Sequence, residues 1–101
     1  MGMKKEGNKY QFDHKMKMAK EFESSGKLLH AVQVYKSIIA DYPCDTEAYF
    51  NLADLYEHFD KVDSAFVLLK DFLNSNPENK EVRLFLGQYL MRNEKWKEDW
   101  N

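Results

Sequence analysis

The chain has little of what disulfide-bonded, membrane-spanning or strongly basic proteins depend on. It contains one cysteine, Cys44, which excludes an internal disulfide. No apolar run approaches the roughly 18–20 residues of a membrane helix, and residues 1–5 precede no apolar segment of the kind that a signal peptide contains. The formal charge of −2 gives no strong attraction to nucleic acid. These features together predict a protein of the reducing cytoplasm, with no membrane span and no nucleic-acid partner.

Helix breakers and catalytic motifs are also scarce. Two prolines and four glycines leave long stretches in which helices can form. The glycines are scattered, which excludes a glycine-rich phosphate loop. The three histidines, His14, His30 and His58, lack the close spacing of zinc ligands. No pair of carboxylates has the sequence pattern of a buried catalytic acid and base. We therefore expect no enzymatic activity, no cofactor and no metal site.

What the sequence does contain is an internal repeat. Shifted by the spacing of its two prolines, the chain aligns with itself, so that Pro43 meets Pro77 and Ala31 meets Ala65. Small residues recur at positions 19, 53 and 87. The turns correspond as well: Gly26-Lys27-Leu28, Asp60-Lys61-Val62 and Glu94-Lys95-Trp96. A fixed period of this length, about 34 residues, indicates an array of similar structural units.

Each unit has the pattern of two amphipathic helices. In the central unit, apolar side chains fall at i, i+3, i+4 and i+7: Tyr49, Leu52, Ala53 and Tyr56. After a polar break at 58–61, a second such pattern begins at Val62 and stops before Pro77. Asp45 and Asn79 stand at positions for N-caps. The sequence thus predicts an all-α protein of antiparallel helix pairs.

The central unit, residues 46–79, resembles the tetratricopeptide repeat through Tyr49, Leu52, Ala53, Tyr56, Ala65, Leu69, Phe72 and Pro77. Residues 12–45 match it too, except at Lys15, where a large apolar residue is usual. Residues 80–101 form a shortened third unit, in which Arg83 replaces the aromatic residue. We therefore expect a basic N-terminal tail over residues 1–11 and one domain over residues 12–101. The resemblance implies helix-turn-helix repeats stacked as a short right-handed α-solenoid.

The resemblance also implies where a partner binds, because the first helices of such repeats line a concave groove. The groove positions form rows with one member from each repeat: Met16, Phe50 and Leu84; Lys20, Asp54 and Gln88; Asp13, Glu47 and Glu81; and Glu23, Glu57 and Met91, with Asn51 beside Phe50. An apolar row flanked by carboxylates suits another protein or peptide with apolar anchors and basic flanks. The implied function is that of a protein-binding scaffold or adaptor. Alternatively, Met16, Phe50 and Leu84 only pack neighbouring helices together.

The two ends of the sequence leave further alternatives open. Trp96 and Trp100 are spaced i and i+4 in the third unit. They either cover the preceding helix as a cap, form an exposed interface for a homodimer, or contact further repeats. The homodimer would make the protein an architectural, self-associating module. The lysines near the N-terminus indicate either a solubilising tail or a contact with an acidic partner or an anionic membrane surface.

Overall fold

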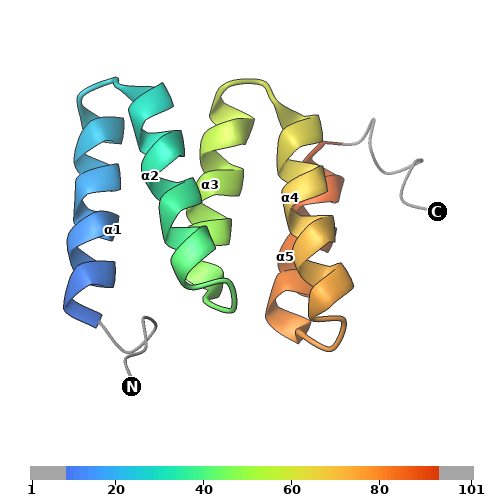
Figure 1. Ribbon diagram of the computed structural model, residues 1–101. Coiled ribbons are helices and arrows are strands. Elements are labelled where there is room, and N and C mark those ends of the chain that lie inside the picture. The colour runs from blue at the N-terminus through green and yellow to red at the C-terminus, as the bar shows by residue number, and fades with distance from the viewer. Residues whose placement is uncertain (1–8, 94–101) are drawn as a thin grey trace, which may run out of the picture. The chain divides into compact units, whose positions relative to one another are not determined.

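The computed structural model describes residues 9–93, which form five α-helices and no strand (Figure 1). The helices are α1 (Lys9–Ser24), α2 (Leu28–Asp41), α3 (Thr46–His58), α4 (Val62–Ser75) and α5 (Lys80–Arg92). This confirms the expected all-α class. Within this part of the chain, no helix has the length and apolar character that crossing a membrane requires. By its internal contacts the chain divides into unit 1 (Met1–Leu55) and unit 2 (Tyr56–Asn101), and the division falls within α3.

Unit 1 contains the antiparallel pair α1 and α2, which lie side by side (Figure 1). Its core consists of the apolar side chains that recur at helical spacing on each helix: Phe12, Met16, Ala19, Ala31, Val32, Tyr35, Ile38, Tyr42, Ala48, Tyr49, Leu52, Ala53 and Leu55. The Phe12 ring packs edge-on against Tyr42, with ring centroids 5.2 Å apart. Among the described residues α1 starts at Lys9, so residues 9–11 of the segment expected to be a tail belong to this helix.

Unit 2 is built around α4 and α5, which contact each other. Its core consists of Val62, Ala65, Leu69, Phe72, Val82, Leu86, Tyr89 and Leu90. The N-terminus of α5 is capped as the sequence predicts, because the Asn79 side chain accepts a hydrogen bond of 2.9 Å from the backbone N–H of Val82. In unit 1 the side chain of Asp45 likewise accepts from the backbone N–H of Glu47, at 3.0 Å, in the first turn of α3.

The period found in the sequence is present in the backbone of both units. Helices α2 and α4 each have 14 residues and start at equivalent positions of successive repeats. The turns before them are closed by equivalent 2.8 Å hydrogen bonds, from Lys27 N–H to Phe22 O and from Lys61 N–H to Tyr56 O. Both turns contain a residue with positive φ: Gly26 at 78° and Asp60 at 67°. The sequence repeat therefore corresponds to a repeat of local structure.

Candidate functional site

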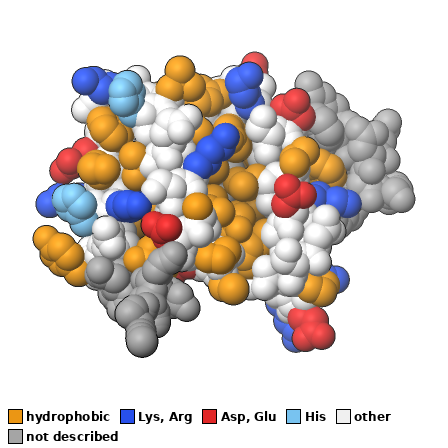
Figure 2. Space-filling model, viewed as in Figure 1, with side chains coloured by type: hydrophobic (Ala, Val, Ile, Leu, Met, Phe, Trp, Pro, Cys, Tyr) orange, Lys and Arg blue, Asp and Glu red, His pale blue; other side chains and the backbone are white. Residues whose placement is uncertain are grey.

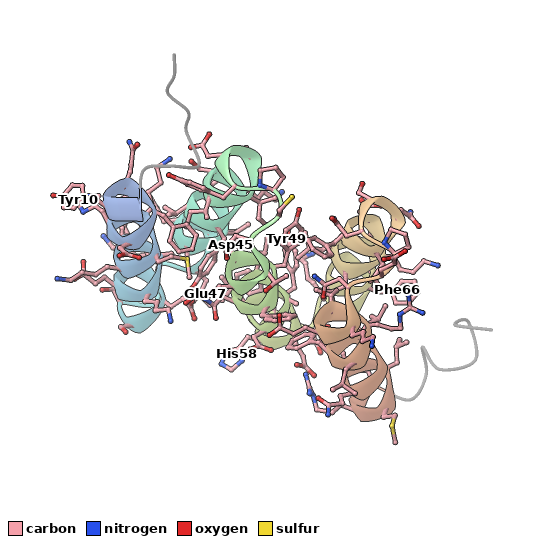
Figure 3. All side chains as sticks on the ribbon, turned by 90° about the horizontal axis from the view of Figure 1, so that it is seen from below. Tyr10, Asp45, Glu47, Tyr49, His58 and Phe66 are labelled. Atoms are coloured by element: carbon pink, nitrogen blue, oxygen red, sulfur yellow. The ribbon has the colours of Figure 1, made fainter. Side chains whose placement is uncertain are left out.

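One side of α3 in unit 1 carries four of the predicted groove residues. Glu47, Phe50, Asn51 and Asp54 follow the spacing i, i+3, i+4 and i+7, which places them along one side of the helix. Glu47 and Asp54 are exposed. Phe50, which lies between them in the sequence, is half-buried. Figure 3 shows Glu47 near the start of α3. We call these four residues the α3 face.

Two carboxylates of the α3 face influence the pKa of a buried tyrosine in unit 1. The Tyr35 side chain is fully buried, and its hydroxyl donates to the carboxylate of Glu23 on α1. Burial, followed by this hydrogen bond, raises the pKa of Tyr35, and the negative charges of Glu23, Glu47 and Asp54 raise it further. The carboxylates of α1 and α3 are thus close enough to act on the same hydroxyl.

Exposure differs among three predicted residues of unit 1: Lys20, Met16 and Asn51. Lys20 is exposed on α1. Met16 is buried, with 6% of its surface exposed, and belongs to the core of unit 1, as the packing alternative expects for this residue. Asn51 is half-buried, and its side-chain nitrogen has no hydrogen-bond partner among the residues that the structure describes. Burying an amide N–H without an acceptor lowers the stability of the fold, and an apolar side chain of similar size would not have this effect.

The remaining apolar candidates lie in unit 2, on one side of α5. Leu84, Gln88 and Met91 are spaced i, i+4 and i+7, and we call them the α5 face. Leu84 is 64% exposed and Met91 66% exposed, so both apolar side chains reach solvent. Together with Lys80, Arg83 and Gly87, they line a shallow, mostly apolar hollow of about 420 Å³.

Glu57, a predicted groove charge, is held by two partners within unit 2. The guanidinium of Arg92 donates to both carboxylate oxygens, at 2.9 and 3.3 Å, and the side chain of Asn93 donates at 3.0 Å. The hydrogen bond from Arg92 is the main cause that lowers the pKa of Glu57. Glu57 therefore ties the end of α3 to the end of α5. Its equivalent one repeat earlier, Glu23, also accepts a hydrogen bond within the fold.

Lys15 has a role that the sequence did not indicate. Its ammonium group donates to the hydroxyl of Ser37 at 2.7 Å and to the carboxylate of Asp41 at 3.3 Å, both on α2. The side chain is half-buried, although it departs from the large apolar residue that is usual at this position of the repeat. The hydrogen-bond acceptors of Lys15 lie on α2, so the apolar periodicity along α1 does not indicate them.

Other exposed side chains among the described residues differ in chemistry. The side of unit 1 seen in Figure 2 carries acidic, basic, histidine and hydrophobic side chains next to one another. Figure 3 shows Tyr10 pointing away from α1, where it is 81% exposed. Cys44 is an exposed free thiol. Within residues 9–93, no three side chains of His, Cys, Asp or Glu are grouped as metal ligands would be.

The two predicted tryptophan positions, Trp96 and Trp100, lie outside the described residues. Most of the candidate residues that the structure does place fall into two groups, the acidic α3 face with Phe50 in unit 1 and the apolar α5 face in unit 2. Comparison with protein-family models, with curated proteins and with solved structures finds no match for this chain.

Proposed function

We propose that the chain is a non-catalytic protein-binding module of the tetratricopeptide type, a scaffold or adaptor. Its ligand on the α3 face would be a peptide or helix with an apolar anchor and basic flanks. The observation that carries the proposal is the placement of half-buried Phe50 between two exposed carboxylates, Glu47 and Asp54, on one side of α3. The period that sequence and backbone hydrogen bonds share supports the repeat architecture.

The aromatic ring and the carboxylates would contribute differently to binding. Covering Phe50 with an apolar side chain of the partner removes apolar surface from water, at about 1.5–3 kcal/mol for a side chain that becomes fully buried. The charges of Glu47 and Asp54 add less affinity, but they orient a basic ligand and speed its association. An interface of this kind has one aromatic residue as its main energetic contributor, with charged residues around it.

Selection from a random peptide library tests the proposal without knowledge of the partner. With the full chain as bait, the selected peptides should share an apolar residue with Lys or Arg on either side. Binding of a synthetic consensus peptide, measured by calorimetry, should weaken at least tenfold in Phe50→Glu. It should also weaken in Glu47→Lys/Asp54→Lys, and more at low than at high ionic strength.

Two matched variants control for loss of folding and for total charge. Leu29→Glu introduces the same side chain at an apolar position of unit 1 that is 72% exposed, and this variant should bind as the parent does. Glu21→Lys/Asp71→Lys changes the net charge by the same amount at exposed sites that do not belong to the α3 face. Circular dichroism verifies the helix content of each variant. If Phe50→Glu is folded and binds the consensus peptide as tightly as Leu29→Glu does, the α3 face is not the binding site.

A further inference from the structure

The hollow on the α5 face differs from the α3 face in the sign of its charge. Among the described residues that line it, two carry a charge, Lys80 and Arg83, and both are basic and exposed. Glu81, the one acidic residue of α5, does not belong to the lining. Charge complementarity therefore favours an acidic ligand on this surface, whereas the sequence predicted a ligand with basic flanks.

The basic side chains stand at one end of an apolar stripe that reaches solvent. Leu84 is 64% exposed and Met91 66% exposed. They are seven residues apart on one side of α5, which separates them by about 10 Å along the helix axis. Lys80 precedes Leu84 by one turn on that side. The surface thus offers two turns of apolar contact that end at a positive charge.

Gly87 leaves the middle of the stripe open. It is partly exposed, and a Cβ atom built on it meets no atom within 4 Å among the residues that the structure describes. Another backbone can approach α5 closely at such a position. The backbone groups within α5 are already bonded to each other, so a partner gains side-chain contacts rather than strand pairing. This favours a helical partner, whose apolar residues at i, i+4 and i+7 match the length of the stripe.

Arg83 is held in position by the segment before α5. Its guanidinium group donates to the carbonyl oxygen of Pro77. A guanidinium has five N–H donors in one plane, and it can bind a carboxylate through two parallel hydrogen bonds. Because the side chain is already held by one bond, less conformational freedom is lost when it binds a ligand.

We propose that the α5 face binds an amphipathic helix of a partner protein that carries an apolar stripe with acidic residues next to it. The apolar side chains of the partner lie on Leu84, Gly87 and Met91, and its carboxylates meet Lys80 and Arg83. A second copy of α5 does not fit this description, because the charges that line its hollow are also basic. This proposal does not rest on the proposed function of the α3 face, which selects the opposite charge.

Two synthetic peptides that differ only in charge test the proposal on the full chain. Each is a helix of about 15 residues, built on alanine and glutamine, with leucines at i, i+4 and i+7. The acidic peptide has glutamates in the turns before and after the leucines, and the basic peptide has lysines there. Backbone amide chemical shifts of the labelled protein report binding residue by residue.

The acidic peptide should shift the amides of α5 and bind there at least tenfold more tightly than the basic peptide. This difference should shrink at high ionic strength. The basic peptide should instead shift the amides of α3 if the α3 face binds as proposed. Because each peptide reports on its own helix, failure of one proposal does not affect the other.

Variants of α5 with matched controls locate the site. Leu84→Glu should weaken binding of the acidic peptide at least tenfold, and Lys80→Glu should weaken it severalfold. Leu29→Glu and Lys61→Glu make the same changes at exposed residues that do not line the hollow, and should bind as the parent does. Gly87→Ala should weaken binding without lowering the melting temperature, because the added Cβ meets no described atom in the free protein.

Four results would each overturn the proposal. The first is the absence of any shift in α5 with the acidic peptide at about millimolar concentration, and the second is equal affinity of α5 for both peptides. The third is a dimeric mass together with α5 shifts that change on dilution, since a second copy would then occupy the hollow. The fourth is a change of tryptophan emission in Leu84→Glu without peptide, since the chain's own tryptophans would then be the occupant.

Discussion

Replacing Tyr35 with phenylalanine removes one oxygen atom from the core of unit 1. The side chain is fully buried, and its hydroxyl donates to the carboxylate of Glu23. A hydrogen bond to a charged group contributes about 1.5–3 kcal/mol to stability. Glu23 is half-buried, so water can solvate its carboxylate in the variant. We therefore expect the free energy of unfolding to fall by about 1.5 kcal/mol, at the lower end of that range.

Thermal unfolding followed by circular dichroism measures this loss. For a chain of this size, 1 kcal/mol corresponds to about 4–8 °C, so Tyr35→Phe should lower the melting temperature by about 6–12 °C. A double-mutant cycle with Glu23→Ala separates the hydrogen bond from other effects of each change. The two single costs should not add, with a coupling of about 1 kcal/mol. Costs that add within about 0.3 kcal/mol would refute the assigned hydrogen bond.

The same pair predicts how stability depends on alkaline pH. Burial and the hydrogen bond to Glu23 raise the pKa of Tyr35 above its ordinary value. A tyrosine in the unfolded chain ionises near pH 10. Because the raised pKa belongs to the folded state, the stabilisation is complete below about pH 10 and is lost as pH rises toward the folded pKa. In urea titrations the parent should therefore lose stability above about pH 10 more steeply than Tyr35→Phe does.

Two further predictions concern the end of α3 and the turns that begin each second helix. Arg92→Ala should cost about 0.5–1 kcal/mol, because the pair with Glu57 is partly exposed but bidentate. Arg92 lowers the pKa of Glu57 in the folded state. The stability that the pair contributes is therefore complete above about pH 4.3, the pKa of an unperturbed glutamate, and is lost as pH falls through the lowered pKa of the folded state. The melting temperatures of the parent and of Arg92→Ala should converge in acid. Gly26→Ala should destabilise by about 1 kcal/mol, because φ is 78° there, whereas Asp60→Gly, at φ 67°, should be neutral or stabilising by up to about 1 kcal/mol. Urea unfolding measures the stability of Gly26→Ala and Asp60→Gly. An equal loss of stability in both variants would contradict the assigned backbone conformations.

The helices and their turns could be predicted because they depend on local patterns. Apolar spacing along each helix, a polar break and a residue tolerant of positive φ are all readable within one repeat. Because the sequence repeats, a local structure predicted for one repeat also applies to the next. Thus the turns before Leu28 and Val62 were predicted together, and both are present. The N-cap at Asn79 was predictable for the same reason, since its hydrogen bond reaches only to Val82 in the first turn of α5.

The roles of individual polar residues were less predictable, because they depend on partners far along the chain. Glu57 was expected to face a ligand, yet its partner Arg92 lies 35 residues later. Met16 occupies the same position in its repeat as Leu84, but the first is buried and the second exposed. Position within a repeat fixes the side of the helix on which a residue lies. Whether another element covers that side is decided by tertiary packing, which the period alone does not specify.

The column formed by positions 15, 49 and 83 shows what one position can require beyond apolar surface. Judged by hydrophobicity, Lys15 and Arg83 are departures from Tyr49. In the structure, all three side chains donate hydrogen bonds: Lys15 to Ser37 and Asp41 on α2, Tyr49 to the carbonyl of Pro43, and Arg83 to the carbonyl of Pro77. Tyr49 and Arg83 therefore anchor the segments that precede α3 and α5 by equivalent contacts. The shared property is a donor at the end of a long side chain, which a hydrophobicity pattern does not register but hydrogen-bonding capacity does.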